Sequence, residues 1–442
     1  MSVTTDAKPG ELPAGRRTFS SLLSRIQAPF SQIPLLSWLL GILVAVIIEQ
    51  IYGAYLAYVL GLTKIPALFG FAIVLKDPEL IPSAILYVLV VYLIPLIVIA
   101  RLTAPLTNRL AAKLLDYPLW FSVLIHIGLL YGALSVWAGV SDYRLLIVRL
   151  TLIAIMFTLS LNVVNGYMGE FSCSHPGFIA LGAYATSIFT LVFFVDERVF
   201  GAPKLPPALG PFLFPLALIV GGAVAALGAI IVAVPSFRTR GDYLAVISLA
   251  FTFMIKSFIE NLEVVGGPRG LGNQPNWASL PVVFAWTMTC IWVINNFVTS
   301  TLGKALNAVR DEESAAEAMT VNTRRTKVVA FLFAAFWAGV AGGLLAHVVR
   351  YINPGSFGLQ NLAEVLAMLY FGGLNSVVGS LVGAVSFNLL SEALRPLEIY
   401  KWIIIPLLLI LVMIFRPTGL IAFREFNVRK LVAPKSHPVE EA

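Results

Sequence analysis

Apolar runs of about twenty residues recur along most of the chain, and they restrict the folds that are open to it. A helix of about 20 residues crosses the hydrocarbon core of a bilayer, so each run predicts one membrane-spanning helix. The composition agrees, because 59% of the residues are hydrophobic and only 12% are charged, against about a quarter in soluble domains. We therefore expect an all-α fold, a polytopic transmembrane helical bundle.

The runs predict about ten full crossings and one broken or re-entrant helix pair. The pair is expected at Glu364–Leu394, because the glycine-rich string FGGLNSVVGSLVGA interrupts an otherwise apolar segment. The full crossings are expected near Pro34–Leu62, Leu80–Ile99, Pro118–Val140, Leu145–Val164, Gly177–Val195, Pro211–Val234, Tyr243–Val265, Leu280–Leu302, Val328–Val349 and Trp402–Phe415.

Polar stretches divide the chain into a tail at 1–33, a three-helix membrane segment at 34–140, a core at 145–420 and a second tail at 421–442. Lys and Arg concentrate on the cytoplasmic side of membrane proteins, so basic tails predict cytoplasmic N- and C-termini. The basic residues that carry this prediction are Arg16, Arg17, Arg25, Arg424, Arg429 and Lys430.

The formal net charge of +7 does not indicate nucleic-acid binding, because the basic residues lie in short loops and tails beside apolar runs. Cys173 and Cys290 form neither a disulfide framework nor a metal site, and no second ligand stands at metal-binding spacing beside His175. The loop GGPRGLG follows a membrane helix rather than a strand, which excludes a dinucleotide fingerprint. We expect no cofactor and no metal.

The stretch from Gly303 to Lys327, GKALNAVRDEESAAEAMTVNTRRTK, is strongly charged and stands between apolar runs. Its helical spacing and acidic start predict an amphipathic helix or pair of helices, and its basic residues place it in the cytoplasm. Small residues interleaved with carboxylates let another protein approach closely, so the stretch is a candidate docking helix. A solvated connection between two spans is the alternative.

A second unusual passage, LNVVNGYMGEFSCSHPGFIALGAY, crowds polar and helix-breaking residues between two apolar runs. Irregular backbone at membrane depth occurs where protein or a water-filled cavity satisfies its polar groups, so the passage is a candidate lining of a pathway. An ordinary loop at the membrane surface is the alternative. The candidate pathway residues, including two from the broken segment, are Asn162, Asn165, Glu170, Ser172, His175, Asn375 and Ser376.

Four segments in order now carry a resemblance to a known family. They are NVVNGYMGEFSCSHPGFIALGAY, GDYLAVISLAF with GGPRGLG, GKALNAVRDEESAAEAM and LYFGGLNSVVGSLVGA, spread over about Leu145 to Leu420. Together they resemble the M-type permease of the bacterial branched-chain amino acid ABC importer. The wider family includes permeases for urea, short amides and other amino acids.

The resemblance implies half of a translocation pathway in the bacterial inner membrane rather than an enzyme. It implies a homologous H-type permease subunit, two cytoplasmic ABC ATPase subunits and a periplasmic substrate-binding protein as partners. The charged stretch at 303–327 would then be the coupling helix that enters a groove on the ATPase. The residues that match its core are Arg310, Asp311, Glu312, Glu313, Ala315, Ala316, Glu317, Ala318 and Met319.

The chain departs from the family pattern at three positions. Family members often have glycine where Thr320 stands, so we expect a less sharp turn after the coupling helix. The polar passage usually has Gln at the position of Glu170 and Gly at that of Ser174. The added carboxylate of Glu170 leaves open whether the substrate is a plain branched aliphatic amino acid.

The chain has no G-x-x-x-x-G-K-[ST] run, so ATP hydrolysis by that chemistry must come from a partner. The alternative function is an ion-coupled secondary transporter or channel for a small polar solute. Such carriers need ionisable groups deep within their spans, for which Glu49, Glu364 and Glu392 are candidates. An intramembrane enzyme is not indicated, because no paired carboxylates or Ser-His arrangement is evident.

Overall fold

The structure is a computed structural model that describes residues 30, 32–62, 78–196, 200–237, 243–395, 400–416, 419–423 and 426–435. Most of the predicted tail at 1–33, with Arg16, Arg17 and Arg25, lies outside the described residues. So do Arg424 and the part of the second tail at 436–442.

The described residues fall into two compact units, and each is described by itself below. The N-terminal unit contains the described residues up to 62, Leu80–Trp137 and the segment from Asn427 onward. The core unit contains Ala138–Phe426. The second tail predicted at 421–442 is therefore divided, because its described residues from Asn427 pack with the first helices of the chain.

In the N-terminal unit, α2 (Leu35–Val59) packs against a long helical stretch made of α4 (Ile81–Val88), the π-helical turn η2 (Leu89–Leu93) and α5 (Ile94–Leu115). Small side chains allow the helices to approach closely. A Cβ on Gly41 would lie 2.9 Å from the backbone oxygen of Leu96. The hydroxyl groups of Ser37 and Thr107 bond to each other at 2.5 Å.

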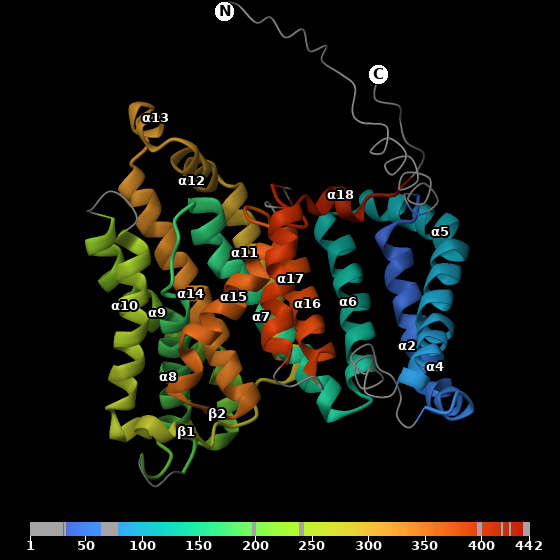
Figure 1. The fold of residues 1–442 in the computed structure, drawn as a ribbon, viewed down its shortest axis with the longest axis horizontal. Helices are drawn as coiled ribbons and strands as arrows, with labels where there is room; N and C mark the ends of the chain where they lie inside the picture. The colour runs from blue at the N-terminus through green and yellow to red at the C-terminus, as the bar shows by residue number, and fades with distance from the viewer. Residues whose placement is uncertain are drawn as a thin grey trace, which may run out of the picture. The chain divides into compact units, whose positions relative to one another are not determined.

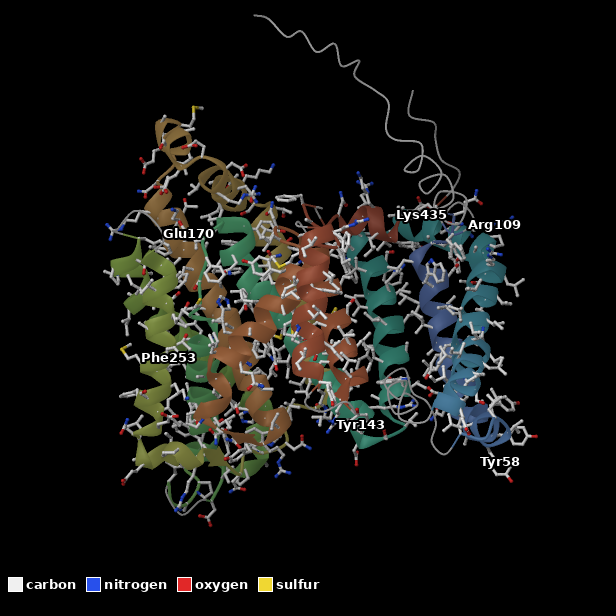
Figure 2. The ribbon with its side chains drawn as sticks, viewed as in Figure 1. Tyr58, Arg109, Tyr143, Glu170, Phe253 and Lys435 are labelled. Atoms are coloured by element: carbon white, nitrogen blue, oxygen red, sulfur yellow. The ribbon has the colours of Figure 1, made fainter. Side chains whose placement is uncertain are left out.

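Two further helices complete the N-terminal unit, namely α6 (Leu119–Ala138) and the short α18 (Val428–Val432). Asn108 on α5 ties both ends of the chain to this unit. Its Oδ1 accepts the backbone N–H of Lys435 at 2.9 Å, and its Nδ2 donates to the backbone oxygen of Gln32 at 3.2 Å. Figure 2 labels Lys435 beside the same end of the unit as Arg109, the residue that follows Asn108.

The core unit is helical apart from a two-residue antiparallel pair, β1 (Leu271–Gly272) with β2 (Tyr351–Ile352). Its principal helices are α7 (Asp142–Asn162), α8 (His175–Phe194), α9 (Gly210–Ser236), α10 (Tyr243–Glu260), α11 (Leu280–Thr299), α12 (Thr301–Asp311), α13 (Glu313–Ala318), α14 (Thr323–Val349), α15 (Leu359–Gly372), α16 (Val377–Ala393) and α17 (Lys401–Phe415). Short single turns occur at η4 (Pro207–Leu209), η5 (Glu263–Val265), η6 (Gly267–Arg269) and η7 (Pro354–Phe357), and η3 (Val163–Met168) extends α7.

Every span predicted from the sequence falls on a helix, and the fold is the expected polytopic helical bundle. Eight helices among the described residues are long and apolar enough to cross a membrane. A ninth candidate is α10 with its bent continuation, where the chain turns by 84°. The predicted last span, α17, has 15 residues, which is short for a crossing. The predicted interruption is present, because α15 ends at Gly372 and α16 begins at Val377.

Helices α8, α9 and α14 form the most closely packed part of the core (Figure 1). Glycines face backbone at their crossings. A Cβ at Gly182 of α8 would overlap the backbone oxygen of Gly339 in α14, and one at Gly342 would overlap that of Ile179. Since lipid supplies no hydrophobic drive between helices, such small-residue contacts gain van der Waals energy through close approach.

We predict that Gly182→Ala destabilises the protein by about 1–3 kcal/mol, because the added methyl group forces two packed backbones apart. The measurement is the midpoint of thermal unfolding in detergent. Gly128→Ala on α6 is the control, because its Cβ meets nothing within 4 Å and alanine is the better helix former. A fall in the midpoint equal for both variants would contradict the packing argument.

Candidate functional site

The polar passage is buried over Leu161–Met168, reaches the surface at Gly169–Phe171 and then returns to the interior of the core. Gly169 and Phe171 are exposed, whereas Ser172 and Ser174 are fully buried. Two side chains of α10 bind its backbone: Ser248 Oγ accepts the N–H of Cys173 at 2.8 Å, and Thr252 Oγ1 donates to its carbonyl at 2.8 Å. Protein side chains thus supply hydrogen-bond partners to the irregular backbone that the helices enclose. Ser172–Ser174 is therefore not an ordinary loop at the membrane surface.

The helix before the passage ends in the π-helical turn η3, which Gly169 closes in a left-handed conformation with φ +75°. A π turn carries an extra residue in the helix and is frequent at functional positions. Gly166 within the turn has no room for a side chain. A Cβ there would overlap Oδ1 of Asn162 and would lie 2.7 Å from the backbone nitrogen of Asn375.

Asn162 joins this turn to the break between α15 and α16. Its Nδ2 donates to the backbone oxygen of Ser376 at 3.0 Å and to Oγ of Ser380 at 2.7 Å. Its Oδ1 accepts the backbone N–H of Asn375 at 3.1 Å. The structure therefore brings together three of the predicted pathway residues, and the amide of Asn162 supplies the hydrogen bonds that the broken segment needs.

Asn165 and Ser172 form a second contact, since Oδ1 of Asn165 accepts the backbone N–H of Ser172 at 3.3 Å. His175 begins α8 and is fully buried. Its ring packs against Phe178 with centroids 5.9 Å apart. The backbone of Ser160 faces the ring, but neither ring nitrogen makes a hydrogen bond of normal geometry to a described residue.

Glu170 lies apart from the buried asparagines, at the end of the core that carries α13 (Figure 2). Its Oε1 is 2.7 Å from Nζ of Lys327, and the same Nζ is 2.9 Å from Oε2 of Glu313. The carboxylate that stood out in the polar passage is thus paired with the charged stretch. Sequence reasoning missed Lys327 as its partner, because 157 residues separate the two.

The charged stretch forms two helices, α12 and α13, as one of the two expected arrangements. Ser300 caps α12 by accepting the N–H of Gly303 at 3.3 Å, and Asn322 caps α14 by accepting that of Arg325 at 2.9 Å. The apolar residues Leu306 and Val309 of α12 are buried. Two apolar residues of the helical spacing thus lie on the inward face of α12.

The two faces of α13 differ. Glu313 and Glu317, one turn apart, bind the start of α14 through Lys327 and through Thr323, whose Oγ1 donates to Glu317 at 3.0 Å. Ala316 is buried between them. The residues that face outward are Ser314, Ala315, Ala318 and Met319, and Met319 is 77% exposed.

Arg310 of α12 is engaged inside the core rather than presented to solvent. Its side chain lies over Gly169, where a Cβ would overlap Arg310 Cγ. Its guanidinium stands 5.6 Å from the ring centroid of Phe423 and pairs with Asp311 at 2.7 Å. This residue of the charged stretch therefore touches the turn that opens the polar passage.

The turn after α13 corrects one expectation. We expected a less sharp turn because threonine stands where glycine is common, but Thr320 adopts the left-handed conformation with φ +67°. The backbone N–H of Val321 still reaches the carbonyl of Ala316 at 3.1 Å, which closes the helix end tightly. A β-branched residue in this conformation stores about 1–3 kcal/mol of strain.

Within the part of the chain that the structure describes, no three His, Cys, Asp or Glu side chains are grouped to hold a metal ion. The arrangement at the site is one of hydrogen bonds, an ion cluster and tight backbone turns.

Comparison with known proteins places residues 143–414 in a family model described as the permease component of branched-chain amino acid transport systems. The chain is 29% identical over 310 residues to the high-affinity branched-chain amino acid transport system permease protein LivM of Escherichia coli, which covers 62% of the chain and 69% of the relative. LivH of the same organism is 29% identical over 144 residues, or 32% of the chain and 46% of the relative. No solved structure matches the chain.

A more distant relative, the ribose import permease protein RbsC of Haemophilus influenzae, is 24% identical over 207 residues. This match covers 43% of the chain and 62% of the relative. The match to LivM extends over about twice the share of the chain that the match to LivH does.

We predict that Asn162→Ala lowers the stability of the core by about 1–3 kcal/mol, because it leaves the buried N–H of Asn375 without its acceptor. The measurement is the thermal unfolding midpoint in detergent. Asn261→Ala is the matched control, since Asn261 is exposed and its amide bonds only to Ser257 of its own helix. Equal midpoints for the two variants would refute the bridging role.

We predict that Thr320→Gly raises the unfolding midpoint, because glycine adopts φ +67° without strain. The gain is expected at about 1 kcal/mol, reduced by the extra entropy of glycine in the unfolded chain. Thr289→Gly provides the contrast, since Thr289 is exposed in the interior of α11 and its replacement should lower the midpoint.

Proposed function

The chain belongs to the family of branched-chain amino acid transport permeases, and from this premise we propose which part of the importer each of its segments forms. As an importer permease it is a multi-pass protein of the bacterial inner membrane. It forms half of the pathway for branched-chain amino acids or for a related small amino acid, amide or urea. Its relative LivH supports an H-type permease as the other half.

The outward face of α13 is the surface that meets an ATPase subunit. The observation that carries this assignment is the exposure of Ser314, Ala315, Ala318 and Met319 on a helix that projects from one end of the core (Figure 1). An unbranched, flexible methionine flanked by small residues fits an apolar groove and allows close approach. This end of the core then faces the cytoplasm, as the basic residues Arg324 and Arg325 support.

The remaining residues of the predicted coupling set act from the inside. Arg310 lies on Gly169, Glu313 binds Lys327, and Ala316 is buried. These contacts hold the docking helix to the core, so that movement of the helix reaches the polar passage. Two cytoplasmic ATPases and a periplasmic binding protein complete the importer, because the chain has no phosphate-binding loop of its own.

The pairing of Glu170 bears on the substrate. A free carboxylate in the passage would favour a cationic or polar substrate, but Glu170 is paired with Lys327 at 2.7 Å, an ammonium group that it shares with Glu313. The departure from the family pattern at this position therefore does not argue against an aliphatic substrate. Ser172, Asn165 and His175 remain the proposed pathway lining, because they lie on the buried part of the passage.

The alternative, an ion-coupled carrier, is favoured by one observation. Glu49 is buried within α2, and carboxylates inside membrane helices commonly serve ion coupling. This residue lies outside the region 143–414 that matches the family. Glu392, another deep candidate, accepts a hydrogen bond from Tyr143 and pairs with Arg395.

Purification of the chain from its native membrane in mild detergent distinguishes the two functions. Recovery of a second permease with one or two ATPase subunits, and ATP hydrolysis by the complex, is the expected result. Recovery of the chain alone, with uptake in proteoliposomes that contain no ATP, would replace the importer by the carrier.

We predict that Ala318→Arg reduces ATPase binding about tenfold, or about 1.4 kcal/mol, because a long charged side chain blocks close approach of the docking face. The readout is the amount of ATPase retained on the purified permease. Ala202→Arg is the control, since Ala202 is also exposed but lies in the loop after α8, far along the core from α13. Equal retention by both variants would remove the docking role.

A further inference from the structure

Lys327, near the start of α14, binds two carboxylates from different parts of the core at once. Its Nζ lies 2.7 Å from Oε1 of Glu170 and 2.9 Å from Oε2 of Glu313. Its side chain is 11% exposed, against 26% for Glu170 and 45% for Glu313. The ammonium group is therefore enclosed, while the Glu313 carboxylate remains accessible to a partner protein.

The charges in this cluster are unequal, with one cation between two anions. The two carboxylates repel each other and share the attraction of the same ammonium group. A basic group on a partner that drew Glu313 away would leave Lys327 with Glu170 alone. Because an enclosed ammonium needs a partner to offset its lost hydration, its hold on Glu170 would then tighten.

The Glu170 side of the cluster is a backbone turn that α12 contacts directly, through Arg310, and that α13 reaches only through Lys327. Gly169, directly before Glu170, has φ +75° and lies under the side chain of Arg310. Arg310 belongs to α12, and Glu313 to α13, which follows it in the chain. Just beyond Glu170 the chain becomes fully buried at Ser172.

We propose that Lys327 is a positioning residue. It transmits the position of the docking helix α13 to the turn at Gly169 and Glu170 in the polar passage. When the partner binds Glu313, the ion pair of Lys327 with Glu313 weakens and its ion pair with Glu170 strengthens. The turn at Gly169 moves with Glu170. This inference rests on the proposed docking role of α13. It adds a defined ionic connection between that helix and the passage.

The test uses the complete importer in proteoliposomes, with uptake of radiolabelled leucine and ATP hydrolysis measured on the same sample. Lys327→Gln is expected to keep its ATPase subunits and to hydrolyse ATP, while leucine taken up per ATP falls about tenfold. Lys327→Arg, which keeps the charge, should restore most of the ratio. Lys256→Gln is the matched control, because it breaks an ion pair with Glu260 elsewhere in the core and should leave the ratio unchanged.

Because Glu170 acts through the ammonium group of Lys327, a double variant gives a further prediction. Glu170→Gln and Lys327→Gln together should lower the ratio no more than Lys327→Gln alone, because both remove the same contact. An unchanged ratio in Lys327→Gln, or independent losses that multiply in the double variant, would overturn the proposal. If Lys327→Gln does not fold, Glu170→Gln alone must show the loss.

The proposed function fails in a different way from this inference. Its failure appears in the unaltered protein, as absence of ATPase subunits or of ATP-dependent uptake. Failure of the inference appears only in the variants, with an intact and active complex as the starting point.

Discussion

Every backbone N–H and C=O group that is enclosed away from water needs a hydrogen-bond partner, and the rest of the structure depends on this constraint. Helices meet this need by themselves, but the chain leaves helical geometry at two enclosed places, after η3 and between α15 and α16. Side chains supply the missing bonds at both. Ser248 and Thr252 serve the first break, and Asn162 serves the second. The candidate site is therefore where the backbone relies on side chains from distant helices.

Glycine has one role where two helices cross and a different role in the backbone turns of the candidate site. At the crossing of α8 and α14, Gly182 and Gly339 allow two regular helices to touch, and any side chain would separate them. At Gly166 and Gly169, glycine instead makes room for two polar side chains, those of Asn162 and Arg310. The first role stabilises the bundle, and the second lets long polar side chains reach a backbone turn. The 34 glycines of the chain thus include residues that meet two separate requirements.

Local patterns in the sequence predicted the helices, the break near Gly373 and the helical form of the charged stretch, because hydropathy and turn residues act over a few neighbours. They did not predict the partners of the site residues. Lys327 and Glu170 are 157 residues apart, and Ser376 and Asn162 are 214 apart, so only the folded chain brings them together. The expectation at Thr320 was wrong because hydrogen bonds at the end of α13 impose a conformation that threonine alone disfavours. Ser248 and Thr252 carried a weak signal, two hydroxyls one turn apart in an apolar helix.

The return of Asn427–Lys435 to the N-terminal unit has a consequence for biosynthesis. Helices α2 and α5 leave the ribosome early, yet the segment that Asn108 of α5 binds is made only after the entire core. Until then the amide of Asn108 and the surface that covers Val432 must remain hydrated or be held by another factor. The N-terminal unit is thus completed only after Asn427–Lys435 has been made, so its final assembly follows the synthesis of the core.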